Sequence, residues 1–252
     1  MRAYTVIYRT TAYLSNQIKL LRRFTDVEEL IVINNGPNFA SIDAECMVRG
    51  VRTIRGPCRE IPSAGGPIGC RSHAAALDRM WQHEGSDYDG DILIIDFDCV
   101  PFAACAVADF LEGVEIASYF RNGAFGKEHV RFPTPVFTAI RRGSQFRKLY
   151  SWRPLDYYPD GYIDTGAEFG MLLIEHPEIK TRTIAVENVT REWFPSALQS
   201  DARIDVAIEP VGMNRSFEVI AGSWLHMGGG CNDWGSEHRQ TLFLDTIKEL
   251  CK

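Results

Sequence analysis

Two aspartates, Asp96 and Asp98, follow the aliphatic run Ile92–Ile95 and are separated by one residue. In layered α/β sheets, ligands bind beyond the carboxyl ends of the strands, so carboxylates at such an end can meet a ligand. Mg²⁺ and Mn²⁺ are hard cations that take carboxylate and phosphate oxygens together. The pair therefore predicts a divalent-cation site; the alternative is that two acidic residues merely end a strand at a solvent-facing turn.

The chain before this pair has the pattern of a strand, a helix and a second strand. Residues 3–8 are β-branched and aromatic, and residues 14–24 carry apolar side chains close to helical spacing. A second apolar run at 30–33 stops at Asn-Asn-Gly-Pro, which is a strong turn signal. A βαβ unit of this length implies parallel pairing within a layered α/β sheet.

The rest of the chain continues the alternation of strands and helices. The run at 91–97 predicts a buried strand, and residues 56–69, rich in glycine and proline, predict a loop. Shorter strands are expected at 51–54, 115–120, 136–140 and 183–186, and helices at 71–83, 165–175 and 241–250. We expect one domain over residues 1–252, with halves at 1–100 and 101–252.

Composition narrows the class of protein. The chain has 252 residues, of which 45% are hydrophobic, and a net charge of −6 without any basic block. The chain therefore lacks the basic patches typical of proteins that bind nucleic acids or membrane surfaces. An anionic ligand would need a cation or local arginines to bind this acidic protein. The seven cysteines form no C-x-x-C pair and are odd in number. We therefore expect a reducing, cytoplasmic setting, with no signal peptide and no membrane span.

Three segments, taken in order, resemble the GT-A glycosyltransferases, in particular the family-2-like nucleotide-sugar transferases. YTVIYRTTAYLSNQIKLLRRFTDVEELIVINNGP resembles their opening, GCRSHAAALDRMW their glycine- and arginine-containing helix start, and IIDFDCVPF their D-x-D motif. The resemblance implies a Rossmann-like α/β/α fold of three layers with a mostly parallel central sheet. Its first half would bind the nucleotide and its second half the acceptor.

The same resemblance implies an activity. It is the divalent-metal-dependent transfer of a sugar from a nucleotide-diphosphate sugar, such as a UDP- or GDP-sugar, to a hydroxyl group of a glycan or other acceptor. The cofactor would be Mn²⁺ or Mg²⁺. Asp98 would be the principal metal ligand, and Asp96 would face the ribose, or the metal through water.

Four further residues are implied to touch the donor. Arg9 and Thr10 stand where the first strand of the family ends at the nucleoside, and Asn35 stands at the turn that contacts base or ribose. Arg71 begins a helix and would reach the diphosphate with its planar guanidinium. Each has a plainer alternative: a surface charge for Arg9, and turn chemistry beside Gly36 for Asn35.

A third metal ligand is implied near the C-terminus, where His226 stands just before three glycines. Neutral imidazole is a competent ligand, and a glycine-rich loop can close over a donor. The alternative is a core histidine at the end of a strand over residues 223–225. On the acceptor side, Asp164 and Glu168 are candidates for the base that removes the hydroxyl proton, although Asp164 would serve equally as a helix cap.

Two other functions remain open from the sequence. Asp96 and Asp98 also resemble the nucleophile and general acid of haloacid-dehalogenase-like phosphatases. Cys99 stands where that motif has threonine, the motif lies near residue 100, and the βαβ unit would be left over. A non-catalytic carbohydrate- or nucleotide-binding protein is the second alternative, since a protein that has lost its activity can keep its fold.

Overall fold

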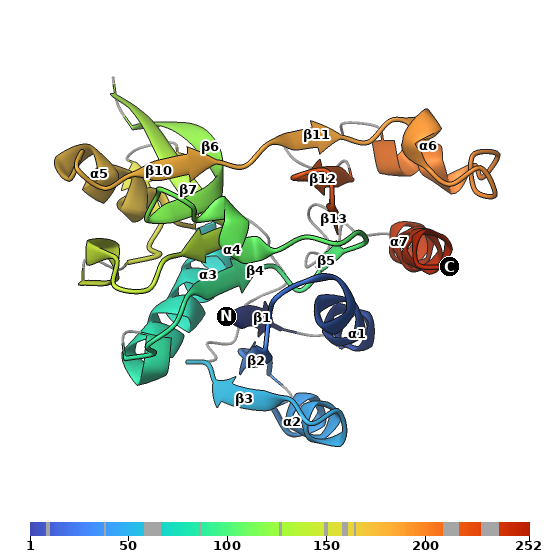
Figure 1. The fold of residues 1–252 in the computed structure, drawn as a ribbon, viewed down its shortest axis with the longest axis horizontal. Coiled ribbons are helices and arrows are strands. Elements are labelled where there is room, and N and C mark those ends of the chain that lie inside the picture. Colours follow the sequence, from blue (N-terminus) through green and yellow to red (C-terminus); the bar gives the residue numbers. More distant parts are fainter. Residues whose placement is uncertain are drawn as a thin grey trace.

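The computed structural model describes residues 1–8, 11–37, 39–57, 67–85, 87–125, 128–148, 151–157, 161–163, 165–208, 217–227 and 237–252. A seven-stranded sheet in the order β10-β6-β7-β4-β1-β2-β3 forms the centre (Figure 1). Its strands are β1 Arg2–Ile7, β2 Glu29–Asn34, β3 Arg52–Arg55, β4 Ile92–Ile95, β6 Ile116–Phe125, β7 Glu128–Ile140 and β10 Thr181–Thr183. Only the pairings of β7 with β4 and β6 are antiparallel, so the sheet is mostly parallel, as expected.

Helices cover both faces of this sheet. Helices α1 Leu14–Phe24, α2 Phe39–Val48 and α7 Glu237–Leu250 pack on one face, and α3 Pro67–Met80 and α5 Ala167–Glu175 pack on the other. Successive strand residues alternate between the two cores: Ala3, Val32, Leu93 and Ile95 face the first, and Tyr4, Ile31, Ile92 and Ile94 face the second. Because both faces are buried there, the central strands β1, β2 and β4 are apolar along most of their length rather than alternating. The expected three-layer α/β/α architecture is confirmed.

The first βαβ unit agrees closely with the sequence pattern. The helix spans Leu14–Phe24 as expected, and the flanking strands pair in parallel from Arg2 opposite Glu29 to Ile7 opposite Asn34. Strands β1, β2 and β4 therefore end at the same edge of the sheet. Helix α2 and strand β3 repeat the unit once more, and their Arg52–Arg55 strand lies at the outer edge.

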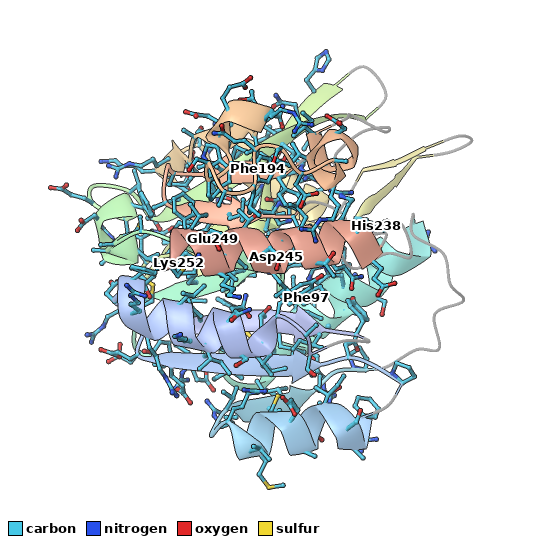
Figure 2. All side chains as sticks on the ribbon, turned by 90° about the vertical axis from the view of Figure 1, so that its right-hand side faces the viewer. Phe97, Phe194, His238, Asp245, Glu249 and Lys252 are labelled. Atoms are coloured by element: carbon cyan, nitrogen blue, oxygen red, sulfur yellow. The ribbon has the colours of Figure 1, made fainter. Side chains whose placement is uncertain are left out.

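A second, four-stranded sheet lies beside the first and was largely not foreseen. Its order is β11-β12-β13-β5, with β11 Val186–Asn188, β12 Glu218–Ile220, β13 Trp224–His226 and β5 Cys99–Pro101. Strands of three residues are too short to show a periodicity, so the sequence pattern missed most of them. Helix α7 lies alongside α1 (Figures 1 and 2), where the rings of Tyr13 and Phe243 pack edge to face, 5.3 Å between centroids.

Two expectations were wrong in detail. The loop expected over 56–69 ends earlier, because α3 already begins at Pro67. Proline is favoured at the first position of a helix, since it has no N–H to leave unbonded there. The strand expected over 183–186 is two strands: the chain leaves the central sheet after Thr183 and enters the second sheet at Val186.

The remaining described elements are short and connect the larger ones. They are the π-helix η1 Trp81–Gly85, helices α4 Val107–Phe110 and α6 Arg203–Ile208, the 3-10 helices η2 Gln145–Lys148 and η3 Arg191–Trp193, and the strand pair β8 Leu155–Tyr157 and β9 Gly161–Ile163. No helix among the described residues is long and apolar enough to cross a membrane.

Candidate metal centre

Asp96 and Asp98 lie on a tight turn that joins β4 to β5. Cys99 donates its backbone N–H to the Asp96 carbonyl at 3.0 Å, which closes the turn. The buried Gln17 of α1 donates its side-chain amide to the carbonyls of Asp96, at 2.9 Å, and Cys99, at 3.0 Å. The turn thus places both carboxylates at the carboxyl edge of the central sheet, in the position that the sequence pattern predicts.

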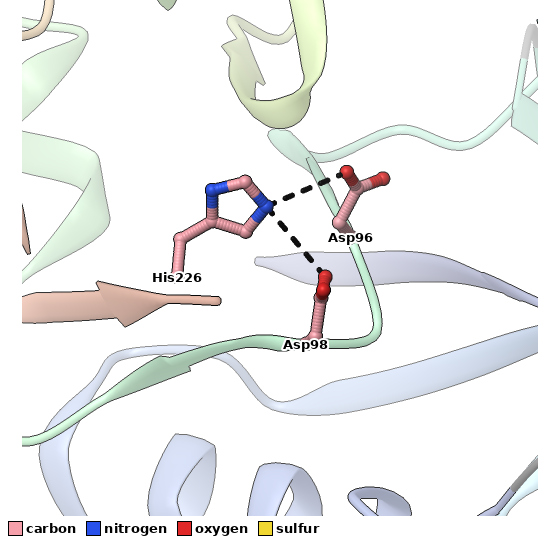
Figure 3. A group of neighbouring side chains, drawn as sticks. All are labelled: Asp96, Asp98 and His226. Atoms are coloured by element: carbon pink, nitrogen blue, oxygen red, sulfur yellow. Dashed lines mark ion pairs between the residues drawn. The ribbon is translucent and has the colours of Figure 1, made fainter. Parts of the chain in front are cut away.

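The tertiary structure brings His226 to the same place. His226 ends β13 and pairs with Cys99 of β5, the residue directly after Asp98. Its Nε2 lies 3.6 Å from Asp98 Oδ1 and 3.9 Å from Asp96 Oδ2 (Figure 3). His226 is the last residue of β13, which pairs with β12 on one side and β5 on the other, so the strand end and not a mobile loop is what the structure shows.

The three side chains have the chemistry and spacing of a cation site. Two carboxylates and one imidazole offer ligand atoms that all lie within 4.8 Å of one another. Atoms about 2.1 Å from a cation and at right angles to one another lie about 3.0 Å apart. The distances of 3.6 and 3.9 Å from His226 Nε2 to the two carboxylates exceed this spacing by less than about 1 Å. Asp98 and His226 are 1% and 2% exposed, and buried carboxylates of this kind need a positive partner.

The charge around His226 is reflected in its pKa. Burial by itself lowers the pKa of His226, but the neighbouring Asp98, Glu218 and Asp96 carboxylates outweigh burial and raise it. A protonated imidazole would therefore supply part of the positive charge that the carboxylates need. A divalent cation would supply more charge and would replace that proton, because a histidine must be neutral at the coordinating nitrogen to bind a metal.

Glu218 contacts the imidazole on the side away from the aspartates, and it was not among the site residues expected from the sequence. Its Oε2 lies 2.8 Å from His226 Nδ1, and the Tyr119 hydroxyl donates to its Oε1 at 3.3 Å. A signal was present, since Glu218 and His226 are equally far along the chain from Gly222. A hairpin centred on that glycine places the two residues opposite one another.

The other residues expected to contact the donor do not join this cluster of Asp96, Asp98 and His226 among the described residues. Arg9 and Thr10 lie outside the described residues. Asn35 is buried and donates its side-chain amide to the carbonyl oxygen of Ser72 at 3.2 Å and to its hydroxyl at 3.1 Å, which ties the end of β2 to α3. Arg71 is exposed in the first half of α3. These contacts give Asn35 a structural role between β2 and α3, and a contact with nucleotide stays a prediction for Asn35 and Arg71.

One more histidine adjoins the centre. His73, on α3, has its Nε2 3.8 Å from Asp96 Oδ1, and its ring packs edge to face against Tyr8 at 6.0 Å. The carboxylate of Asp96 therefore lies between two imidazoles, one from α3 and one from β13.

Of the two acceptor-side candidates, the structure describes one. Asp164 lies outside the described residues. Glu168, in the first turn of α5, accepts a hydrogen bond from the Ser151 hydroxyl. It lines an open pocket of about 250 Å³ together with residues of α3, η1 and the segment before β8, namely Asp78, Trp81, Gln82, Ser151 and Arg153. A role for Glu168 as a base stays a prediction.

Comparison with known proteins gives distant structural likenesses. No protein-family model matches the chain, and no curated protein matches it. A mannosyltransferase from Pyrobaculum calidifontis, solved with GDP-mannose and Mn²⁺, is 12% identical with a TM-score of 0.45; the match covers 72% of this chain and 53% of that one. A nucleoside-diphosphate-sugar pyrophosphorylase from Vibrio cholerae RC9 is 9% identical with a TM-score of 0.39, covering 73% and 92%. Likenesses this distant assign no ligand or reaction to this chain.

Proposed function

We propose that this protein is a divalent-metal-dependent glycosyltransferase that uses a nucleotide-diphosphate sugar as donor. The observation that carries the proposal is the convergence of Asp96, Asp98 and His226 at the carboxyl edge of a mostly parallel sheet. This edge is where α/β sheets bind nucleotides. A cation held there, Mn²⁺ or Mg²⁺, neutralises the charge that a departing nucleoside diphosphate develops.

The protein's own residues have separate tasks in this proposal. Asp98, on the turn before β5, and His226, the last residue of β13, would hold the cation, and Asp96 would complete the site beside the donor. Arg71, exposed on α3, would bind the diphosphate through its guanidinium group. On the acceptor side, Asp164 or Glu168 takes the proton of the attacking hydroxyl, if the reaction inverts the anomeric centre. Residues 1–100 then bind the nucleotide, and residues 101–252 supply the acceptor side and His226.

Thermal unfolding with a panel of UDP-, GDP- and CMP-sugars, with and without Mn²⁺, tests this proposal. A donor at a hundred times its dissociation constant stabilises a protein by about 2.7 kcal/mol, which for this length is a rise of roughly 5–10 °C in the unfolding temperature. We expect one nucleotide series to give this rise, only with Mn²⁺. Asp98→Asn should abolish the rise, whereas the exposed Asp109→Asn of α4 should keep it.

The same assay, with product detection, separates the two alternatives. Hydrolysis of a phosphate ester that Asp96→Asn abolishes, without a response to any nucleotide sugar, would establish a phosphatase instead. Binding of a nucleotide sugar without release of nucleoside diphosphate, in the presence of broad acceptor mixtures, would establish a non-catalytic binding protein. The position of His226 Nε2 between the two carboxylates favours metal ligation over a nucleophile and general acid pair. The free cysteines Cys46, Cys99, Cys105 and Cys251 support a reducing, cytoplasmic setting.

A further inference from the structure

Glu218 and His226 are direct partners across the β12–β13 hairpin. Their Cα atoms stand opposite one another, two pairs away from the turn. The turn uses left-handed backbone at Ala221, with φ of 52°, and at Gly222, with φ of 67°. A hairpin fixes the register of its strands, and a slip by one residue would turn both side chains to the other face. The placement of the glutamate behind the histidine is therefore set by the backbone.

The contact between the two side chains decides which nitrogen of His226 carries hydrogen. Glu218 Oε2 and His226 Nδ1 are 2.8 Å apart, and the two residues are 5% and 2% exposed. An ionised carboxylate only accepts, so Nδ1 is the donor, and the lone pair of the neutral imidazole is then on Nε2.

Glu218 is itself held in place by the central sheet. The hydroxyl of Tyr119, on β6, donates to Glu218 Oε1 at 3.3 Å. The positive charge of Arg121, on the same strand, also stabilises the ionised Glu218. A donor and a charge from β6 thus offset the cost of burying this carboxylate. The chain of contacts runs from β6 through Glu218 and His226 to Asp98.

From this geometry we infer that Glu218 is the positioning residue of the metal centre, orienting the His226 ring and fixing the tautomer that presents Nε2 to Asp96 and Asp98. The inference rests on the metal site of the proposed function, and it adds how that site is prepared. Carboxylates that accept from the second nitrogen of a ligating histidine orient the ring and raise its basicity. Glu218 is placed to do both, without touching the cation itself.

The test is a graded series at residue 218, read by Mn²⁺ titration in a calorimeter. Glu218→Gln keeps an acceptor but removes the charge, and Glu218→Met removes both with a side chain of similar length. We expect about tenfold weaker Mn²⁺ binding for the glutamine variant and roughly a hundredfold for the methionine variant. The matched control is Glu187→Gln, on the neighbouring strand β11, where the side chain is exposed; it should bind Mn²⁺ as the wild type does.

A second readout does not depend on metal. Nitrogen-15 NMR of the metal-free protein, at alkaline pH where the imidazole is neutral, reports the tautomer of His226. The wild type should carry hydrogen on Nδ1, and Glu218→Met should shift it to Nε2, where Asp98 accepts it. Tyr119→Phe, which leaves the glutamate in place, should weaken Mn²⁺ binding only a few-fold. If the methionine variant does not fold, the glutamine and phenylalanine variants still decide.

The outcomes separate this inference from the proposed function. Wild-type Mn²⁺ affinity in a folded Glu218→Gln variant, or hydrogen on Nε2 in the wild type, overturns the positioning role alone. Mn²⁺ binding that depends on Glu218, in a protein that releases no nucleoside diphosphate from any donor, supports the positioning role and overturns only the transferase. A wild type that binds no Mn²⁺ overturns both.

Discussion

The side-chain amide of Gln17 lies 2.9 Å from the backbone carbonyl of Asp96 and donates a hydrogen bond to it. A second hydrogen bond from the same nitrogen reaches Cys99, so one buried glutamine spans both ends of the turn that carries the two aspartates. Helix α1, which belongs to the first βαβ unit, therefore holds the turn that carries Asp96 and Asp98. The part of the chain with the clearest sequence pattern thus holds in place the turn that carries the two aspartates.

Replacing Gln17 by methionine should loosen this turn. The substitution keeps the side-chain length but removes the amide donor from two carbonyls. The Asp96 carbonyl keeps its hydrogen bond from the Cys99 N–H, whereas the buried Cys99 carbonyl loses its Gln17 donor, and an unsatisfied buried group costs about 1–3 kcal/mol. We expect the unfolding temperature to fall by several degrees and Mn²⁺ affinity to fall by more than tenfold. Unfolding is followed by circular dichroism and affinity by titration. The exposed Gln145→Met should change neither, and an unchanged Mn²⁺ affinity in Gln17→Met would show that α1 does not support the site.

The two aspartates should differ in their importance for the cation. The Asp98 side chain is 2% exposed beside His226, whereas the Asp96 side chain is 17% exposed and is therefore more accessible to solvent. We expect Asp98→Asn to weaken Mn²⁺ binding roughly a hundredfold or more, since loss of a direct ligand exceeds the 10–100-fold typical of a supporting residue. Asp96→Asn should lose less affinity for Mn²⁺ alone and more for the donor in the presence of Mn²⁺. Equal losses in both titrations would contradict this division.

The affinity for Mn²⁺ should rise with pH. The carboxylates raise the pKa of His226 above its ordinary value of 6.5, so the proton on Nε2 competes with the cation until the pH passes this raised value. The metal-free protein has the opposite trend: stability from protonated His226 is complete below the ordinary pKa and is lost as the pH rises through the raised one. Titrations from pH 6 to 9, in buffers of different ionisation enthalpy, measure affinity and proton release together. Affinity independent of pH would contradict a proton on His226.

Substitution of His226 distinguishes a role as a metal ligand from a role as a packed core residue. His226→Ala should weaken Mn²⁺ binding roughly a hundredfold while the protein remains folded, since a ligand is lost but the β12–β13 register is kept. The exposed His238→Ala on α7, labelled in Figure 2, is the matched control and should bind Mn²⁺ normally. Loss of folding in His226→Ala, with Mn²⁺ affinity retained in the folded fraction, would identify a core histidine.

Glu168 offers a test of the acceptor side. As a base it should contribute on the order of a hundredfold or more to the rate of transfer, while leaving donor binding unchanged. We therefore expect Glu168→Gln to lower the release of nucleoside diphosphate strongly and to keep the thermal shift with donor and Mn²⁺. Glu175→Gln, exposed at the other end of α5, is the control. A full rate in Glu168→Gln would assign the glutamate to its hydrogen bond with Ser151 alone.

The sequence by itself determined the central architecture and one half of the candidate metal centre, the Asp96 and Asp98 pair. The apolar runs at β1, β2 and β4 are long enough to show that both faces of their sheet are buried, and local patterning also places α1. The D-x-D pair needs no distant contact to be found, because its two residues are neighbours in the chain and follow a strand end.

Only the tertiary structure decided how the site is completed. Asp98 and His226 are far apart in the sequence, and they meet because β13 pairs with β5. The strands of this sheet are too short to be recognised from the sequence pattern. Glu218 enters through the register of a hairpin, and Tyr119 through a strand of the other sheet. Such contacts depend on pairing between distant segments, and pairing is decided by the burial of whole faces rather than by local residue preference.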